Sequence, residues 1–217
     1  MRGMMKTLAC LIVAIAIAVP TIAAQERPGL FFREDWKEIP AATPVTQEHV
    51  SHPDLLVARH GPGEAGIKKS HHDRPADDPY YIWSGETEGN WALSLRNQKS
   101  QVDLTGLGKI RWRSKQAGFR MLRIILKTAG GQWLVSDQSD PASSDWRVRE
   151  FNIGDIRWRR LDIKKIVEGE WVNEPDLSRI EEIGFTDLMP GGQSVACSRL
   201  DWIEVYGRPA QRQSSSR

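Results

Sequence analysis

The chain has 217 residues, of which 40% are hydrophobic and 27% are charged. This composition is typical of a globular domain and excludes wholesale disorder, a collagen-like fibre and a membrane protein with several spans. The 30 Lys and Arg residues nearly balance the 28 Asp and Glu residues. Such a balance does not favour general binding of polyanions through net charge.

The first 24 residues have the pattern of a secretory signal peptide. Arg2 and Lys6 precede an apolar run from Leu8 to Val19, and the small residues Ala23 and Ala24 follow. The run is too short to span a bilayer as a helix. We therefore predict cleavage near Ala24 and export to the periplasm or the medium. Removing Arg2 and Lys6 leaves 28 basic residues (30 minus 2) against 28 acidic ones, a net charge of zero.

Cysteine usage agrees with this prediction. Cys10 lies inside the predicted signal peptide, so Cys197 is the only cysteine of the mature chain and no intramolecular disulfide can form. Most of the apolar run follows Cys10, which argues against a lipid anchor at that residue. A mature chain of about 190 residues can bury roughly 70% of its unfolded surface, so it can fold in an oxidising compartment without a disulfide.

From Leu30 onward the sequence alternates between apolar and polar residues in short segments, and no long stretch has the period of an amphipathic helix. In the clearest segment, Ile110 and Trp112 alternate with Arg111 and Arg113. The predicted strands are Leu30–Trp36, Leu55–Arg59, Tyr80–Trp83, Asn90–Arg96, Lys109–Lys115, Phe119–Lys127, Gln132–Ser136, Asp145–Phe151, Ile180–Thr186 and Leu200–Tyr206.

The connections favour an antiparallel fold. Ala129–Gln132 is typical of a hairpin turn. Between residues 155 and 178 the alternation fails, and Leu161–Val167 is a candidate for a short helix. Strands that follow one another without βαβ alternation predict an all-β fold, a single antiparallel sandwich or jelly roll of about nine or ten strands over residues 25–207. The polar tail of residues 208–217 is predicted to be disordered.

Three segments of the carboxyl half resemble the last strands of galactose-binding-like β jelly rolls. They are Trp146–Phe151, Leu177–Phe185 and Leu200–Val205. This class includes many carbohydrate-binding modules and the domains of complex I intermediate-associated type. The resemblance covers residues 102–207, and its loose motifs imply the fold more than the function.

The most unusual feature of the sequence is the position of its histidines. The stretch from Arg59 to Pro79 has no strand or helix period, and long irregular loops in compact domains are often functional. The alternative is a solvated loop whose histidines bond locally. All five histidines fall between residues 49 and 72, as His49, His52, His60, His71 and His72.

Acid–base chemistry suits this loop, because histidine titrates near neutral pH and tyrosine can deliver a proton. Resemblance in architecture to β-sandwich polysaccharide lyases implies a His or Tyr base beside cationic groups that neutralise a uronate. The candidate catalytic residues are His71, His72, Tyr80 and Tyr81, with Arg111 or Arg113 as the cation. The spacing of His71, His72 and Asp73 does not match a transition-metal site. No nucleophile-elbow motif surrounds any serine.

A second candidate feature is basic. The stretch Lys109–Lys127 contains seven Lys or Arg residues and no acidic residue. Arginine pairs with carboxylate or sulfate through two hydrogen bonds, so an outward arginine patch predicts an anionic glycan ligand. The alternative is a solvated face that acidic residues of adjacent strands balance. The arginines are Arg111, Arg113, Arg147 and Arg149.

All nine tryptophans lie between Trp36 and Trp202, in the predicted mature chain. Apolar faces of sugars stack on exposed aromatic rings, whereas most tryptophans of a sandwich belong to its core. The predicted core tryptophans are Trp91, Trp112, Trp146 and Trp202. The candidate binding tryptophans are Trp83, Trp133, Trp158 and Trp171, and the loop residues His60 and Asp73 join them as ligand candidates.

The resemblance to carbohydrate-binding jelly rolls also implies a structural calcium ion, held by carboxylates near the first and last strands. Glu34, Asp35 and Asp201 are the corresponding acids by position. No other cofactor is implied. Export, a zero net charge and the absence of zinc-finger, P-loop and dinucleotide motifs argue against nucleic acid as a partner.

These observations lead to three hypotheses. The first is an exported carbohydrate-binding jelly-roll protein, with uronic acid or sulfated glycans as candidate ligands. The second is a polysaccharide lyase or glycoside-modifying enzyme on the same scaffold that uses a His/Tyr acid–base pair. The third is a structural or assembly protein of the cell envelope.

Overall fold

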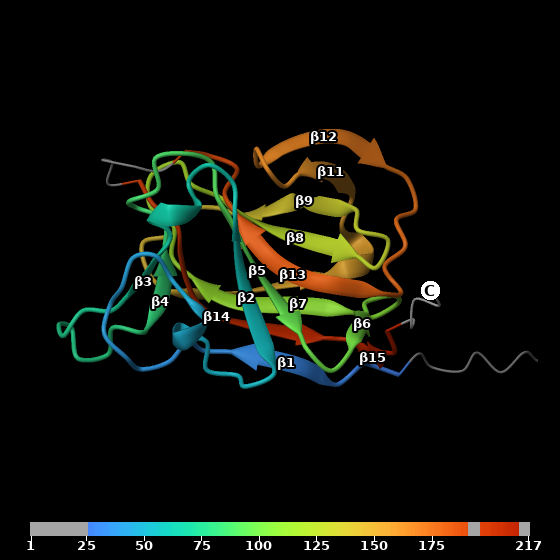
Figure 1. Ribbon diagram of the computed structural model, residues 1–217, viewed down its shortest axis with the longest axis horizontal. Helices are drawn as coiled ribbons and strands as arrows, with labels where there is room; N and C mark the ends of the chain where they lie inside the picture. Colours follow the sequence, from blue (N-terminus) through green and yellow to red (C-terminus); the bar gives the residue numbers. More distant parts are fainter. Residues whose placement is uncertain (1–25, 191–195, 213–217) are drawn as a thin grey trace, which may run out of the picture.

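The computed structural model describes residues 26–190 and 196–212. Two antiparallel sheets face each other as a sandwich, and no α-helix occurs in these residues (Figure 1). The predicted all-β jelly-roll class is confirmed. The predicted signal peptide lies outside the described residues. Within the described ranges, no helix has the length and apolar character that a bilayer span requires.

One sheet has six strands. Its order is β10-β7-β14-β4-β3, and β1 pairs with β14 on the edge that β14 also shares with β4. The strands are β1 (Leu30–Glu34), β3 (Lys68–Ser70), β4 (Tyr81–Trp83), β7 (Lys109–Ser114), β10 (Arg147–Asn152) and β14 (Arg199–Tyr206).

The other sheet has nine strands. Its order is β12-β11-β9-β8-β13-β5-β2, and β6 joins β13 to β15. The strands are β2 (Leu55–His60), β5 (Ala92–Asn97), β6 (Gln101–Asp103), β8 (Leu122–Thr128), β9 (Trp133–Asp140), β11 (Trp158–Asp162), β12 (Val167–Val172), β13 (Ile180–Thr186) and β15 (Arg208–Ala210). Three short 3₁₀ turns are η1 (Gln47–His49), η2 (Glu64–Gly66) and η3 (Ile153–Asp155).

The ten strands predicted from alternation all occur, with ends that move by a few residues. The hairpin between β8 and β9 occurs as well, and Gly131 supplies the positive φ of 82° that its turn requires. Five further strands, β3, β6, β11, β12 and β15, bring the described total to fifteen. The prediction was too low because three of the five have only three residues and β12 has no buried face.

Two local predictions were wrong. The segment Leu161–Val167 is not a helix, since it contains the end of β11 and the start of β12, which pair as a hairpin. The tail is ordered in part, because Arg208–Ala210 pair with Gln101–Asp103. Backbone hydrogen bonds to a neighbouring strand can therefore order a segment that has little apolar content of its own.

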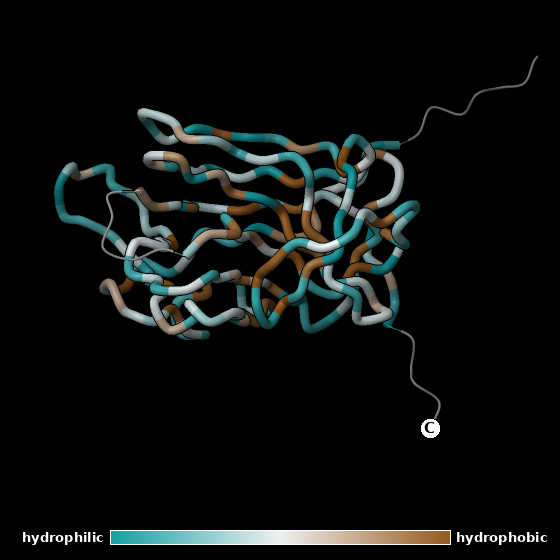
Figure 2. Tube along the Cα trace, turned by 90° about the horizontal axis from the view of Figure 1, so that it is seen from above, coloured by the Kyte–Doolittle hydropathy of each residue, from teal (hydrophilic) through white to brown (hydrophobic). Residues whose placement is uncertain are grey.

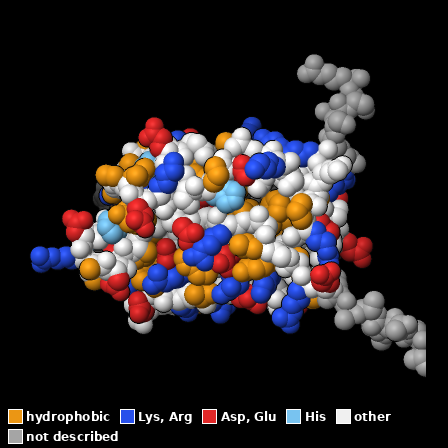
Figure 3. Space-filling view, turned by 90° about the horizontal axis from the view of Figure 1, so that it is seen from below, with side chains coloured by type: hydrophobic (Ala, Val, Ile, Leu, Met, Phe, Trp, Pro, Cys, Tyr) orange, Lys and Arg blue, Asp and Glu red, His pale blue; other side chains and the backbone are white. Residues whose placement is uncertain are grey.

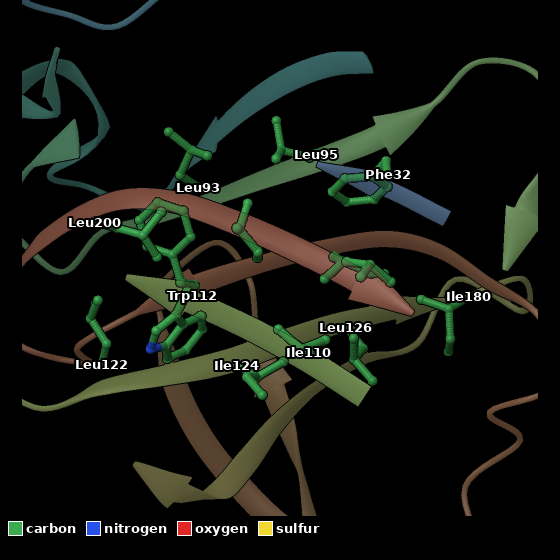
Figure 4. Close-up of a cluster of buried hydrophobic side chains, with 14 of the residues drawn as sticks. Phe32, Leu93, Leu95, Ile110, Trp112, Leu122, Ile124, Leu126, Ile180 and Leu200 are labelled. Atoms are coloured by element: carbon green, nitrogen blue, oxygen red, sulfur yellow. The ribbon is translucent and has the colours of Figure 1, made fainter. Parts of the chain in front are cut away.

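Between the sheets lies one continuous apolar core. Figure 4 shows side chains from β1, β5, β7, β8, β13 and β14 that point toward one another, among them Phe32, Leu93 and Trp112. Figure 2 shows the same arrangement along the chain, with hydrophobic positions gathered in the middle of the molecule. The alternation of apolar and polar residues explains this core, because every second side chain of a strand points inward.

One buried carboxylate links the two sheets. Asp140, at the end of β9, is fully buried and accepts hydrogen bonds from Trp112 Nε1, at 3.0 Å, and from the Ser114 hydroxyl. Arg147 of β10 donates to the same carboxylate, from Nε at 3.1 Å. A buried charge is stable only when it is paired and hydrogen-bonded, and Asp140 meets both conditions.

We predict that Asp140→Ala lowers the free energy of unfolding by about 3 kcal/mol, because it leaves the Trp112 N–H and the Arg147 guanidinium without their acceptor. Urea unfolding followed by tryptophan fluorescence measures the loss. Glu168→Ala is the matched control, since Glu168 pairs with Arg123 at the surface and its removal should change stability by less than about 1 kcal/mol. Equal losses in the two variants would contradict this role of Asp140.

Candidate functional site

The irregular part of the histidine-bearing stretch is shorter than predicted. Between residues 59 and 79 the chain completes β2, passes through η2 and forms β3. The longest irregular stretch of this segment is His71–Tyr80, between β3 and β4, and this loop projects from one end of the sandwich (Figure 1). This loop is hydrophilic and forms the outermost bend at the left of Figure 2. The short antiparallel pair of β3 and β4 therefore carries the loop.

The histidines do not converge. His49 is buried in η1, where its Nδ1 accepts the Thr46 N–H at 2.9 Å. His60 lies on the outer face of the nine-stranded sheet, 2.9 Å from the Ser94 hydroxyl and edge-on to Trp133. Only His71 and His72 belong to the projecting loop. The cluster in the sequence thus resolves into separate sites, because strands β2 and β3 belong to different sheets.

A cavity of about 590 Å³ lies between the projecting loop and the outer face of the six-stranded sheet. We call it the loop groove. The loop contributes Asp77, His71 and Tyr80, and the sheet contributes Arg113, Asp201 and Trp202. Five of the residues predicted from the sequence meet here, namely His71, Tyr80, Arg113, Asp35 and Asp201.

Strand register explains why the sheet residues share one face. Arg113 lies directly opposite Trp202 across β7 and β14, and opposite Val148 across β7 and β10. Residues directly opposite each other in an antiparallel pair project to the same side. Trp112 and Ile203 therefore point into the core, while Arg113 and Trp202 point out.

Aromatic rings and guanidinium groups alternate along this face. The Arg33 guanidinium lies 4.4 Å from the centre of the Trp202 ring, and that of Arg113 lies 5.5 Å from the centre of Trp146. Trp146 in turn meets Tyr81 edge-to-face, with ring centres 5.3 Å apart. Cation–π contacts hold such rings in fixed orientations at a surface.

The prediction that Trp146 and Trp202 belong to the core was wrong. Both are partly exposed. For Trp202 the signal was present in the sequence, since Ile203 and Val205 point inward and Trp202 must then face the other way. A β-bulge between Leu200 and Trp202 obscures this alternation. Leu200 and Trp202 are two residues apart and would share a face in a regular strand, but the bulge turns Leu200 inward while Trp202 points outward. Trp91 and Trp112 are core residues, as predicted.

The outward arginines are already paired with carboxylates. Arg113 bonds Asp201 at 2.7 Å, and Arg111 bonds Glu204 at 3.2 Å. Arg33 bonds both Glu204 and Asp35 at 2.6 Å. The structure therefore agrees with the second alternative, in which acidic side chains of adjacent strands neutralise the arginines of this face. Acidic and basic side chains are also interspersed over the surface in Figure 3.

The lining of the loop groove contains more acidic than basic side chains. Among the described residues that line it, five are carboxylates and two are arginines. Burial raises the pKa of Asp201, although the hydrogen bond from Arg113 acts in the opposite direction. Glu38 and Asp77 add carboxylates at the rim. An anionic ligand would meet repulsion there.

Arg147 and Arg149 do not belong to the outward patch, so this part of the prediction was wrong. Both lie on the same side of β10 as the buried Phe151, and both approach the Asp140 carboxylate. Strand β10 is an edge strand, where inward charges can reach a buried partner near the rim. The parity of Phe151 was the sequence signal for this orientation.

The loop is fixed from below by a buried lysine. Lys69 is fully buried, its ammonium donates to the Ile39 carbonyl oxygen, and it lies 3.9 Å from the centre of the Tyr80 ring. His71 stacks on the same ring at 3.9 Å, with the planes inclined by 14°. This stack orders one wall of the loop groove. Burial lowers the pKa of Lys69 to about 8, while the Glu38 charge acts in the opposite direction.

His72 has a different environment. Its Nδ1 lies 3.0 Å from Asp78 Oδ2 and 3.2 Å from the Tyr81 hydroxyl. The side chain is 64% exposed, so the other ring nitrogen has access to solvent. Burial raises the pKa of Tyr81, which keeps its hydroxyl protonated at neutral pH. The four predicted acid–base residues thus form two pairs, one stacked and one hydrogen-bonded.

The other candidate ligand residues lie elsewhere. Asp73 is exposed at the tip of the loop. Trp83 packs against Gly85 and lies beneath the Lys68 ammonium. Trp158 is only 2% exposed, so it belongs to the core. Trp171 is exposed on the other sheet, and the guanidinium groups of Arg157 and Arg159 each lie 4.1 Å from its ring centre.

The three candidate calcium ligands have other partners. Glu34 is buried and accepts N–H bonds from Trp36, Ser51 and His52. Asp35 and Asp201 pair with Arg33 and Arg113. Within the described ranges, no group of three or more His, Cys, Asp or Glu residues is arranged to hold a metal ion. The arrangement gives no support to a calcium ion at these residues.

No protein-family description and no curated protein matches this sequence. Among solved structures, a family 11 carbohydrate-binding module of a cellulosomal cellulase of Clostridium thermocellum is similar over 79% of this chain and 97% of its own, with a TM-score of 0.47 and 16% identity. A family 29 module solved with mannohexaose is similar over 81% and 92%, with a TM-score of 0.44 and 10% identity.

An exo-beta-agarase is similar over 75% of this chain and 24% of its own, with a TM-score of 0.41 and 10% identity. Carbohydrate-binding modules are thus among the neighbours of this chain, as they are among the jelly rolls that its carboxyl half resembles. Because these TM-scores lie below 0.5, we base the functional proposal on the side chains of this chain.

The buried Lys69 gives a pH test of the loop wall. The folded chain releases the Lys69 proton near pH 8, whereas the unfolded chain releases it near the ordinary pKa of 10.5. Between these values the unfolded state binds more protons, so stability should rise with pH. We predict that urea unfolding shows this rise in the natural chain and a smaller one in Lys69→Met. The prediction is wrong if the difference in stability between the two proteins is the same at pH 7 and pH 10.

Proposed function

We propose that the chain binds a neutral polysaccharide in the loop groove. The observation that supports this most is the partly exposed ring of Trp202, which lies in one groove with several carboxylates and beside the stacked rings of His71 and Tyr80. Apolar faces of sugar rings pack on aromatic rings, and carboxylate oxygens accept hydrogen bonds from sugar hydroxyls. The fixed rings reduce the entropy that binding would otherwise cost.

The charges in the groove favour a neutral ligand over an anionic one. A uronate or sulfate would need a free guanidinium, yet Arg33 and Arg113 are engaged by Asp35 and Asp201. Exchanging those carboxylates for a ligand anion would leave two acids without partners. The proposal therefore departs from the anionic glycan considered for the sequence, and neutral hexose polymers take its place.

Export is part of the proposal. A polysaccharide ligand lies outside the cytoplasm, and the pattern of residues 1–24 supports secretion. The mature protein would then meet the polymer in the periplasm or in the medium.

Trp202→Ala tests the groove directly. The loss of an aromatic platform should weaken binding of a neutral glycan about tenfold. Isothermal titration with mixed-linked β-glucan, cellohexaose and mannohexaose measures it, with polygalacturonate and chondroitin sulfate as anionic probes. Trp171→Ala is the matched control and should change nothing, because Trp171 lies on the other sheet and does not line the loop groove.

Three outcomes would count against the proposal. Tight binding of an anionic probe would favour the anionic glycan that was predicted from the sequence. Equal effects of Trp202→Ala and Trp171→Ala would place the site elsewhere. Binding of no glycan, together with capture of a protein partner from envelope extracts, would favour an assembly role.

A second candidate function, an enzyme on the same scaffold, has one specific observation in its favour. Asp78 and the Tyr81 hydroxyl both contact His72 at Nδ1, which leaves Nε2 able to act as a base. Arg111 and Arg113 are engaged by Glu204 and Asp201, so a cation to neutralise a uronate is not free. In this second hypothesis, turnover would depend on His72 as the general base.

His72→Ala separates an enzyme from a binding protein. If the chain is an enzyme, the variant should lose at least about 100-fold in turnover of a polysaccharide. Its glycan affinity should change little, because Trp202 and the carboxylates that line the groove remain in place. Unsaturated product absorbance and reducing-end release measure turnover. A binding protein shows neither signal in the natural chain or in the variant.

A further inference from the structure

A second cavity lies at the far end of the same sheet face. It has a volume of about 620 Å³ and is lined by residues that include Leu107, Lys109, Glu150, Asn152 and Tyr206. We call it the end pocket. Lys109 lies directly opposite Tyr206 across β14 and opposite Asn152 across β10. These three residues therefore project to the same side as Arg113 and Trp202.

The distance between the two cavities follows from strand geometry. Trp202 in the loop groove and Tyr206 in the end pocket are four residues apart on β14. At about 3.3 Å per residue, the two rings stand about 13 Å apart along the strand. Arg113 and Lys109 have the same separation on β7.

The side chains between the cavities form a continuous row. Arg111 lies 5.9 Å from the centre of the Trp202 ring, and its guanidinium donates to the Tyr206 hydroxyl at 3.4 Å. Glu204, between the two aromatic residues, accepts hydrogen bonds from Arg111 and from Tyr206. The row thus alternates aromatic surface with polar atoms that sugar hydroxyls can bond.

The end pocket has the same kind of lining as the loop groove. Lys109 lies 4.8 Å from the centre of the Tyr206 ring and is paired with Glu150 at 3.0 Å. Leu107 is 42% exposed and adds apolar surface at the rim. A paired charge beside an aromatic ring again offers no free cation for an anion, but it suits a neutral sugar.

We propose that the end pocket is a second subsite of the glycan site, so that the face of β7 and β14 binds internal stretches of a polymer that reach from Trp202 to Tyr206. This inference depends on the proposed function. It adds that the ligand is a chain of several sugar units rather than a mono- or disaccharide.

Chain length is the test. Isothermal titration of the full chain with cellobiose and cellohexaose, and with mannobiose and mannohexaose, compares a ligand that fits one subsite with one that spans both. We expect at least one hexasaccharide to bind about tenfold or more tightly than its disaccharide. Leu107→Arg, which places a long charged side chain at the rim of the end pocket, should remove this advantage and leave disaccharide binding unchanged.

Leu56→Arg is the matched control, since Leu56 is 38% exposed on the other sheet. It should leave both affinities as they are. Equal affinity for short and long ligands, or an equal loss for both in Leu107→Arg, would overturn the second subsite while the loop groove remains a sugar site. If no oligosaccharide binds, both proposals are overturned.

Discussion

Ion pairs between β7 and β14 determine the chemistry of the outer sheet face. Arg113 with Asp201 and Arg111 with Glu204 place opposite charges on neighbouring strands, and each carboxylate is largely buried. A buried carboxylate is stable only with such partners, so these pairs cannot be opened without a large loss. They also hold the guanidinium groups against Trp202 and Trp146. Fixed rings and neutralised arginines follow from the same contacts, and together they favour a neutral ligand.

The projecting loop depends on a second constraint, the buried ammonium of Lys69. That ammonium bonds the Ile39 carbonyl oxygen and contacts the Tyr80 ring, so it joins the segment before β2 to the loop. Backbone bonds between Lys69 and Ala42 support the same connection. The loop is polar and has few apolar contacts of its own, and without this support it would belong to the least stable part of the fold. One wall of the groove therefore depends on a charge that burial disfavours.

Much of the fold could be predicted because alternation reports burial directly. Ile110 and Trp112 point inward and Arg111 and Arg113 outward, as the period of two requires. The same rule failed where a strand departs from regular geometry or lies at an edge. A bulge beside Trp202 changes the parity of β14, and Asp140 draws Arg147 and Arg149 inward on β10.

The site could be predicted only in part. His71, Tyr80 and Arg113 were candidates from their residue types, and they do meet in one groove. The sequence contained no signal that His60 would lie on the other sheet, since that separation depends on which strands pair. It also could not reveal that each outward arginine has a carboxylate partner, because Asp201 and Glu204 lie about 90 residues further along the chain.

Indole N–H signals of ¹⁵N-labelled protein titrated with mixed-linked β-glucan test the central claim most directly. The tryptophans lie in the core, on the face of β7 and β14, on the outer face of the other sheet and, for Trp83, on β4. Binding on the proposed face should shift the signals of Trp202 and Trp146 and leave those of Trp91 and Trp112 in place. Shifts at Trp133 and Trp171 instead, with Trp202 unchanged, would show that the glycan binds the opposite sheet and would contradict this account.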